Sequence, residues 1–175
     1  MEVTPVQSIA VFGWWAQPRS VVAWDDIKKL NASWRRLRTE YGFTSEQLAK
    51  LQPDKSEWVK RGALTLHDMP DMLAFPVNPF VDLGADIAEV WSMQWPVELL
   101  VQMDVTFEHM RTRGLSPQLM RHFAIPLSGW QQLRLQIGDL DSWSDDDVES
   151  VFNLDRSELR DILDSYRVCT ELQKT

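Results

Sequence analysis

The sequence predicts an all-α protein with an N-terminal arm, one longer helix, and then an array of short capped helices. Two observations predict this fold: residues suited to a helix start recur about every ten positions, and an apolar residue follows each at fixed spacing. About ten residues hold roughly two helical turns and a tight connection. Because isolated helices shorter than about 12 residues are marginal in water, each must be stabilised by stacking on neighbours, in a solenoid-like or a compact array.

Each repeat has an apolar first position, a helix-start residue directly after it, and apolar residues five and usually eight positions further on. Ser, Thr and Asp accept hydrogen bonds from the first turn of a helix, and Pro suits the first helical position. The first positions are Phe43, Pro53, Leu64, Phe75, Ala85, Trp95, Val105, Leu115, Ile125, Leu135, Trp143 and Leu154. The fifth positions, which we expect in the core, are Leu48, Trp58, Met69, Phe80, Val90, Leu100, Met110, Met120, Trp130, Leu140, Val148 and Leu159.

The segments before the array follow a different pattern. Residues 1–23 are interpreted as an arm, in which the adjacent Trp14 and Trp15 either fold back on the first helices or contact a partner. Trp24-Asp25-Asp26-Ile27 is typical of a capped helix start, and apolar residues continue from there at helical spacing. One long helix is therefore predicted from residue 24 to about residue 40, ending near Gly42.

The array contains irregular places and has a defined end. Pro70 and Pro79 predict short or kinked repeats near residues 64–84, and Gly138-Asp139 predicts a turn instead of a full helix. Arg61 and Arg113 replace the apolar residue at the eighth position. We expect one helical-repeat domain over residues 24–168, with the array at about 43–163 and a tail over 169–175.

Composition and charge limit the class of protein. The sequence has no apolar run near the roughly 20 residues of a membrane span, no pattern of a secretion signal, and a single cysteine, Cys169, so a soluble, non-secreted protein without disulfides is expected. The net charge is -8, yet residues 28–61 are mainly basic and residues 139–164 mainly acidic. These charges are either ordinary solvated helix faces or surfaces that steer partners.

No catalytic or metal-binding motif stands out. His67, His109 and His122 lack the spacing of a metal site, and the three aspartates after Ser144 suit the positive end of a helix. With no nucleophile motif or glycine-rich phosphate loop, we expect no catalytic residue, no metal and no cofactor, although a small enzyme with unrecognised chemistry stays open. The candidate partner-binding residues are Trp14, Trp15, Lys28, Lys29, Arg35, Arg36, Arg38, Arg61 and Arg113.

Two stretches carry a family resemblance. Tyr41-Gly42-Phe43-Thr44-Ser45-Glu46-Gln47-Leu48 and Arg113-Gly114-Leu115-Ser116-Pro117-Gln118-Leu119 resemble the ten-residue G-F-[ST]-x-x-x-L helical repeats of proteins from large nucleocytoplasmic DNA viruses. Many repeats depart from that motif, and only Gly42, Gly62, Gly84 and Gly114 stand near its glycine. The resemblance implies a virus-encoded scaffold or minor virion component without an active site, located in the virion or the host cytoplasm.

The expected function is therefore structural or interaction work, as a minor capsid or scaffold-type protein that binds itself, capsid components or other proteins. The alternative is a module concerned with nucleic acid. In that case the basic face binds phosphate, or the acidic end mimics DNA and occupies the basic groove of a host protein.

Overall fold

The computed structural model describes residues 23–72 and 77–172, which form helices and, within these ranges, no strand. The prediction of an all-α fold is confirmed. Contacts group the chain into two compact units, residues 1–78 and 79–175, where the sequence had predicted one domain over 24–168. We call them the N-terminal and C-terminal units and describe each by itself. The predicted arm, with Trp14 and Trp15, lies outside the described residues apart from Ala23.

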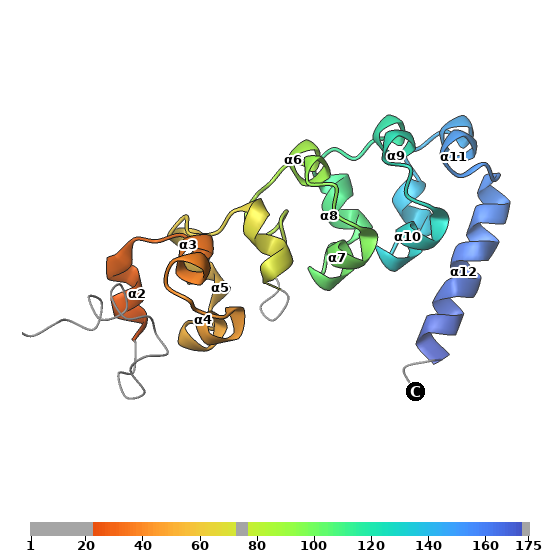
Figure 1. The fold of residues 1–175 in the computed structure, drawn as a ribbon. Coiled ribbons are helices and arrows are strands. Elements are labelled where there is room, and N and C mark those ends of the chain that lie inside the picture. The colour runs from red at the N-terminus through yellow and green to blue at the C-terminus, as the bar shows by residue number, and fades with distance from the viewer. Residues whose placement is uncertain (1–22, 73–76, 173–175) are drawn as a thin grey trace, which may run out of the picture. The chain divides into compact units, whose positions relative to one another are not determined.

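The N-terminal unit contains α2 (Trp24–Leu30), α3 (Trp34–Thr39), α4 (Ser45–Leu51), α5 (Lys55–Lys60) and the 3₁₀ helix η2 (Leu66–Asp71) (Figure 1). Tryptophans form much of its core. Trp34 and Trp58 are fully buried, and their rings meet edge to face at 4.8 Å between centroids. Trp24 packs edge to face on Trp58 at 4.5 Å. These rings therefore act as core side chains.

The prediction of one long helix over residues 24–40 is wrong, because two short helices occupy this segment. Asn31 ends α2 in the left-handed conformation, with φ 45°. Ser33 then caps α3 by accepting a hydrogen bond from the Arg36 N–H, and the Trp34 N–H donates to the Ala63 carbonyl. An unbroken helix would lose this cap and this tertiary bond. Ala32 and the buried Leu37 stand five apart, so the repeat also covers this segment.

The C-terminal unit contains α6 (Ile87–Ser92), α7 (Val97–Gln102), α8 (Phe107–Thr112), α9 (Pro117–Phe123), α10 (Leu127–Gln132), the 3₁₀ helix η3 (Ile137–Leu140), α11 (Asp145–Phe152) and α12 (Arg156–Leu172). With 17 residues, α12 is the longest described helix. The predicted tail from residue 169 is wrong in its start, because the helix continues to Leu172. No Gly or Pro interrupts the chain between residues 156 and 172, so nothing forces a turn there.

The structure confirms the two main features of the repeat. Each residue that follows a first position within the described ranges stands directly before a helix, including Gln136, which is not of a helix-start type. Each fifth-position side chain is buried, at most 3% exposed. The eighth position is less regular, since Met103 and Leu133 are buried whereas Ile162 is exposed. The irregular regions form 3₁₀ helices: η2 contains Pro70 and is as long as several of the α-helices, whereas η3, which contains Gly138 and Asp139, has only four residues.

The connections between helices share one backbone conformation. In the C-terminal unit a residue with positive φ recurs every ten positions, at Gly84, Gln94, Asp104, Gly114, Ala124 and Arg134. The N–H after it donates to the carbonyl of the preceding fifth position in several repeats, as from Val105 to Leu100 and from Leu135 to Trp130. This is the bonding of a left-handed helix cap. The same connection therefore joins successive short helices in this unit.

Helices three repeats apart stack on one another in the C-terminal unit. Trp91 of α6 stacks on Phe123 of α9 at 3.6 Å between centroids, and the Phe107 N–H of α8 donates to the Leu133 carbonyl before η3 at 2.6 Å. Arg121 of α9 donates to Ser150 of α11. In Figure 1, α6, α9 and α11 accordingly lie in one row. This unit is therefore a solenoid with three repeats per turn.

Candidate interaction surfaces

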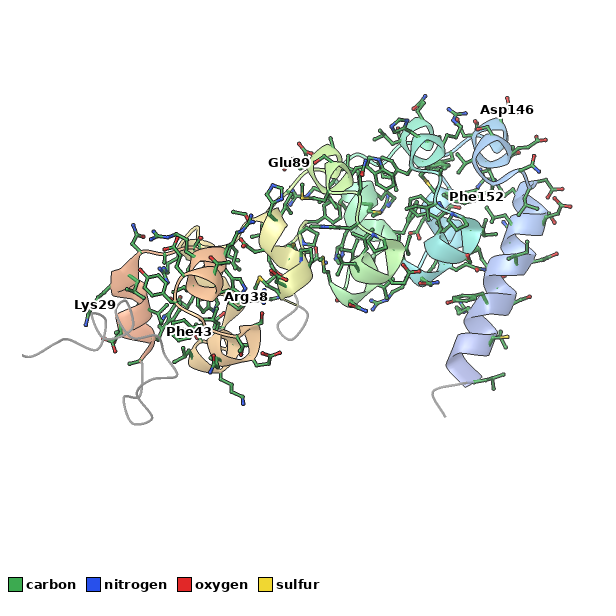
Figure 2. All side chains as sticks on the ribbon, viewed as in Figure 1. Lys29, Arg38, Phe43, Glu89, Asp146 and Phe152 are labelled. Atoms are coloured by element: carbon green, nitrogen blue, oxygen red, sulfur yellow. The ribbon has the colours of Figure 1, made fainter. Side chains whose placement is uncertain are left out.

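The predicted basic surface of the N-terminal unit is largely balanced by neighbouring acids. Lys28 and Lys29 pair with Asp25 and Asp26 within α2, and Figure 2 shows Lys29 projecting outward from this helix. In α3 and beyond, Arg36 pairs with Glu40 and Arg38 with Asp71, while Arg35 is exposed. Hydrogen bonds from Arg36 lower the pKa of Glu40 below its usual value, which favours the ion pair. The surface therefore offers little uncompensated positive charge.

Arg61 and Arg113, which replace the apolar residue at the eighth position of the repeat, connect repeats that stack on one another. Arg61 donates to the Ala32 carbonyl, and its guanidinium lies over the Trp24 ring at 5.5 Å. Arg113 donates to the Gly84 and Phe80 carbonyls at 3.1 and 2.7 Å. Arg61 and Arg113 each reach back 29 residues, to the connection three repeats earlier. Their polar contacts are thus explained by internal bracing, and burial lowers the pKa of Arg61.

Exposed apolar side chains gather on the second half of α12. Ile162, Tyr166, Val168 and Leu172 are 38%, 37%, 54% and 69% exposed, and they make up most of the large exposed apolar side chains of the described residues. Leu159 and Leu163 on the same helix are buried against the array. At about 100° per residue, Ile162 and Tyr166 lie near each other, and Val168 and Leu172 lie near each other about 120° further round the helix.

The charges on α12 are separated by side. At about 100° per residue, Arg156, Arg160 and Arg167 fall together on one side of the helix. The side opposite Leu159 and Leu163 carries Glu158, Asp161 and Asp164 together with the exposed Val168 and Leu172. On α11 the acidic run continues with Asp146, which Figure 2 shows pointing away from the array. We call the side of α12 that contains Glu158, Asp161, Asp164, Val168 and Leu172 the outer face.

A groove of about 470 Å³ lies between α12 and the segment around η3, and its α12 residues include Leu163 and Arg167, on the side of the helix that faces the array. Leu135 and Ile137 line one wall, and Leu163, Asp164 and Tyr166 of α12 line the other. Its polar lining residues include Gln131, Gln136, Arg134 and Arg167. The groove is therefore lined by both apolar and charged or polar side chains.

The remaining polar clusters are accounted for by local contacts. His109 takes part in the cap of α8, where its Nδ1 accepts from the Thr106 N–H. Asp147 accepts from the Ser144 hydroxyl at the start of α11, as expected for charge at a helix start. A second pocket, of about 400 Å³, is lined by Arg38, Ser45, Glu46 and Asp71, whose ion pair and hydrogen bonds are internal.

Two further findings concern only the described part of the chain. Within it, no group of three or more His, Cys, Asp or Glu residues is arranged to hold a metal ion. No helix of residues 23–72 or 77–172 is long and apolar enough to cross a membrane.

Sequence reasoning missed the outer face. Ile162, eight positions after the first position Leu154, was expected to pack, and residues 169–175 were expected to form a tail. The missed signal is the uninterrupted helical spacing of apolar residues beyond Leu163, with acidic residues on one side only. No family model matches this chain, and neither the curated proteins nor the solved structures include a match to it.

Proposed function

We propose that this chain is a non-enzymatic interaction protein, most specifically a scaffold-type or minor capsid protein encoded by a large DNA virus. The observation that carries the interaction role is the outer face of α12, where exposed apolar side chains lie among carboxylates on a helix that continues past its last buried residue, Leu163. Many side-chain oxygens of the helix-start residues accept hydrogen bonds in helix caps. Because these oxygens have a structural role, they support the proposal of a non-enzymatic protein. The viral assignment is supported by the ten-residue repeat resemblance alone.

The viral role is tested by where the protein is found. Quantitative mass spectrometry of purified particles and of the surrounding infected-cell lysate should find the chain enriched in the particles or in assembly intermediates. Equal abundance in all fractions, together with a protein that purifies from cells without any bound protein, would exclude a scaffold or capsid role. The location in virion or host cytoplasm is decided by the same fractions.

The nucleic-acid alternative makes a different prediction. Direct phosphate binding through the Lys28 to Arg61 segment is weakly supported, because its main cations are paired with acids. A DNA mimic is favoured by the acidic α11 and α12. A gel-shift titration at low salt tests the first version, because phosphate contacts weaken steeply as salt rises. Displacement of DNA from a basic DNA-binding protein would support the second.

A further inference from the structure

Seven helices of the described ranges begin with one common hydrogen bond. The backbone N–H of the residue just before the helix donates to the side chain three positions further on. In α8 the acceptor is a nitrogen, Nδ1 of His109, at 3.2 Å from the Thr106 N. In the other six it is an oxygen, of Asp26, Gln47, Asp68, Glu89, Asp139 or Glu158.

The two kinds of acceptor differ in their response to mild acid. An amide oxygen or an ionised carboxylate still accepts a hydrogen bond when the solution is moderately acidic. An imidazole accepts only in its neutral form, because both nitrogens of the charged form are donors. Histidine is also the side chain that ordinarily titrates between about pH 5 and pH 8. Of the seven bonds, the one to His109 therefore depends on pH in this range.

We propose that His109 is an acid-sensitive cap: mild acid removes the bond from the Thr106 N–H and loosens the start of α8, while the other six helix starts keep their bonds. The unfolded chain lacks this bond, so folding favours the neutral ring. Stability is then present in neutral solution and is lost as the pH falls through the histidine range. This inference does not depend on the interaction role proposed above.

The position of the cap connects it to the stacking of repeats. Thr106 directly precedes Phe107, whose N–H donates to the Leu133 carbonyl at 2.6 Å. The Phe107 ring is buried and meets the Trp130 ring edge to face, at 5.9 Å between centroids. Loosening the first turn of α8 therefore weakens contacts with the repeats that follow it, in addition to the helix itself.

Charged neighbours determine how large the effect is. On α8 itself, hydrogen bonds from Arg111 lower the pKa of Glu108, and the charge of His109 contributes less. Glu108 thus attracts a charged His109 and reduces the acid sensitivity. Charged or titratable groups on the neighbouring segments are Asp82 and Asp86 beside Gly84, Glu98 on α7, Asp104 with Arg134, Arg121 and His122 on α9, and Asp139 of η3.

The test compares the full chain with His109→Gln in urea unfolding at about pH 7.5 and about pH 5. Gln keeps an acceptor at this position without titrating, as Gln47 does in α4. The unfolding equilibrium constant of the original chain, relative to that of His109→Gln, should rise at least about threefold at the lower pH, since one hydrogen bond is lost. Glu108→Gln should make the chain more acid-sensitive.

The matched control is His122→Gln. His122 is exposed and lies in the last turn of α9, where positive charge is favourable. The unfolding constant of the original chain relative to His122→Gln should therefore not rise in acid. Circular dichroism establishes that each variant is folded at both pH values.

Nuclear magnetic resonance tests the bond in the original chain, so it decides the proposal even if His109→Gln does not fold. At neutral pH the ring proton of His109 should be on Nε2, because Nδ1 is the acceptor. The exchange protection of the Thr106 amide should fall at least about threefold in mild acid. That of Thr44, which donates to Gln47, should stay unchanged.

Three outcomes would overturn the proposal. One is a neutral His109 ring with its proton on Nδ1, which would make the bond from Thr106 impossible. Another is equal protection of the Thr106 amide at both pH values. The third is a rise in the unfolding constant of the original chain relative to His122→Gln that matches the rise relative to His109→Gln, because the pH effect would then belong to histidines in general.

Discussion

The residue before the first position of a repeat determines the backbone turn, whatever its side chain. Gly84 and Gly114 adopt positive φ without steric cost, but Gln94, Ala124 and Arg134 adopt it as well. A residue with a Cβ is strained in this conformation, by about 1–2 kcal/mol. The array therefore keeps the positive-φ connection at Gln94, Ala124 and Arg134, although these residue types do not favour that conformation.

Replacing Ala124 with Gly should stabilise the protein. Ala124 is exposed with φ 52°, and its methyl group can form no compensating hydrogen bond. We expect Ala124→Gly to raise the free energy of unfolding by about 0.5–1 kcal/mol after the entropy cost of Gly is counted. Urea denaturation measures it. Ala88→Gly, at an exposed helical position in α6, should instead lower the value by about 0.5–1 kcal/mol, and stabilisation by both changes would contradict the explanation.

Removing the Arg113 side chain should destabilise the C-terminal unit. Its guanidinium donates to two carbonyls, of Phe80 and Gly84, that lie about 30 residues earlier. We expect Arg113→Ala to lower the free energy of unfolding by about 1.5–3 kcal/mol, the range for charged hydrogen bonds. Arg111→Ala, two residues away, breaks only an exposed pair with Glu108 and should cost less than about 1 kcal/mol. Equal effects in thermal or urea unfolding would refute the bracing role.

At the scale of an element, an ionisable helix cap makes the stability of a helix depend on pH. Asp54 caps α5, and hydrogen bonds from the Ser56 side chain and backbone lower the pKa of Asp54 below 3.8, its usual value. Because the folded pKa is the lower one, this contribution to stability is complete above the unfolded pKa and is lost as the pH falls through the folded value. The stability of the unmodified chain should therefore decline below about pH 4.

The variant Asp54→Asn isolates this effect. Asn can cap a helix without ionising. The difference in unfolding free energy between the original chain and Asp54→Asn should be constant above about pH 5 and should shift in favour of Asn below about pH 4. Ser56→Ala should reduce that shift, since it removes the first cause of the lowered pKa. A difference that does not change with pH would exclude the contribution of Asp54.

The close contact of α10 with α7 gives a second prediction for an element. A Cβ added to Gly129 would lie 2.7 Å from Ile125 Cγ2 and 3.3 Å from Val97 Cγ2. Although Ala favours helix more than Gly does, we expect Gly129→Ala to lower the free energy of unfolding by about 1–3 kcal/mol through overpacking. Gly138→Ala in η3 is the control, because the added Cβ would meet only Asp141 Oδ2 at 4.0 Å. If Gly129→Ala instead stabilised the protein, α10 and α7 would not be in the close contact described at Gly129.

At the scale of the whole molecule, the sequence predicted the repeat better than the surfaces. Start residues and fifth positions are set by local capping and by burial, so their spacing alone located both. The break at Asn31 was missed because apolar spacing on either side of it fits one helix as well as two, and because the start of α3 is also held by a long-range bond from the Trp34 N–H to the Ala63 carbonyl. Arg61 and Arg113 were interpreted as partner sites because contacts 29 residues apart do not follow from a local pattern.

The stacking of helices that lie three repeats apart also predicts which part of the chain can fold by itself. Because repeats bind neighbours three positions away, a segment with several turns of the array should retain its own core. The brace from Arg113 to Phe80 and Gly84 lies wholly within residues 79–175. We therefore expect a fragment of these residues to unfold cooperatively in urea. Near-ultraviolet circular dichroism should show an ordered environment for the buried Trp130, and loss of that signal at normal helix content would mean that residues 1–78 are needed for packing.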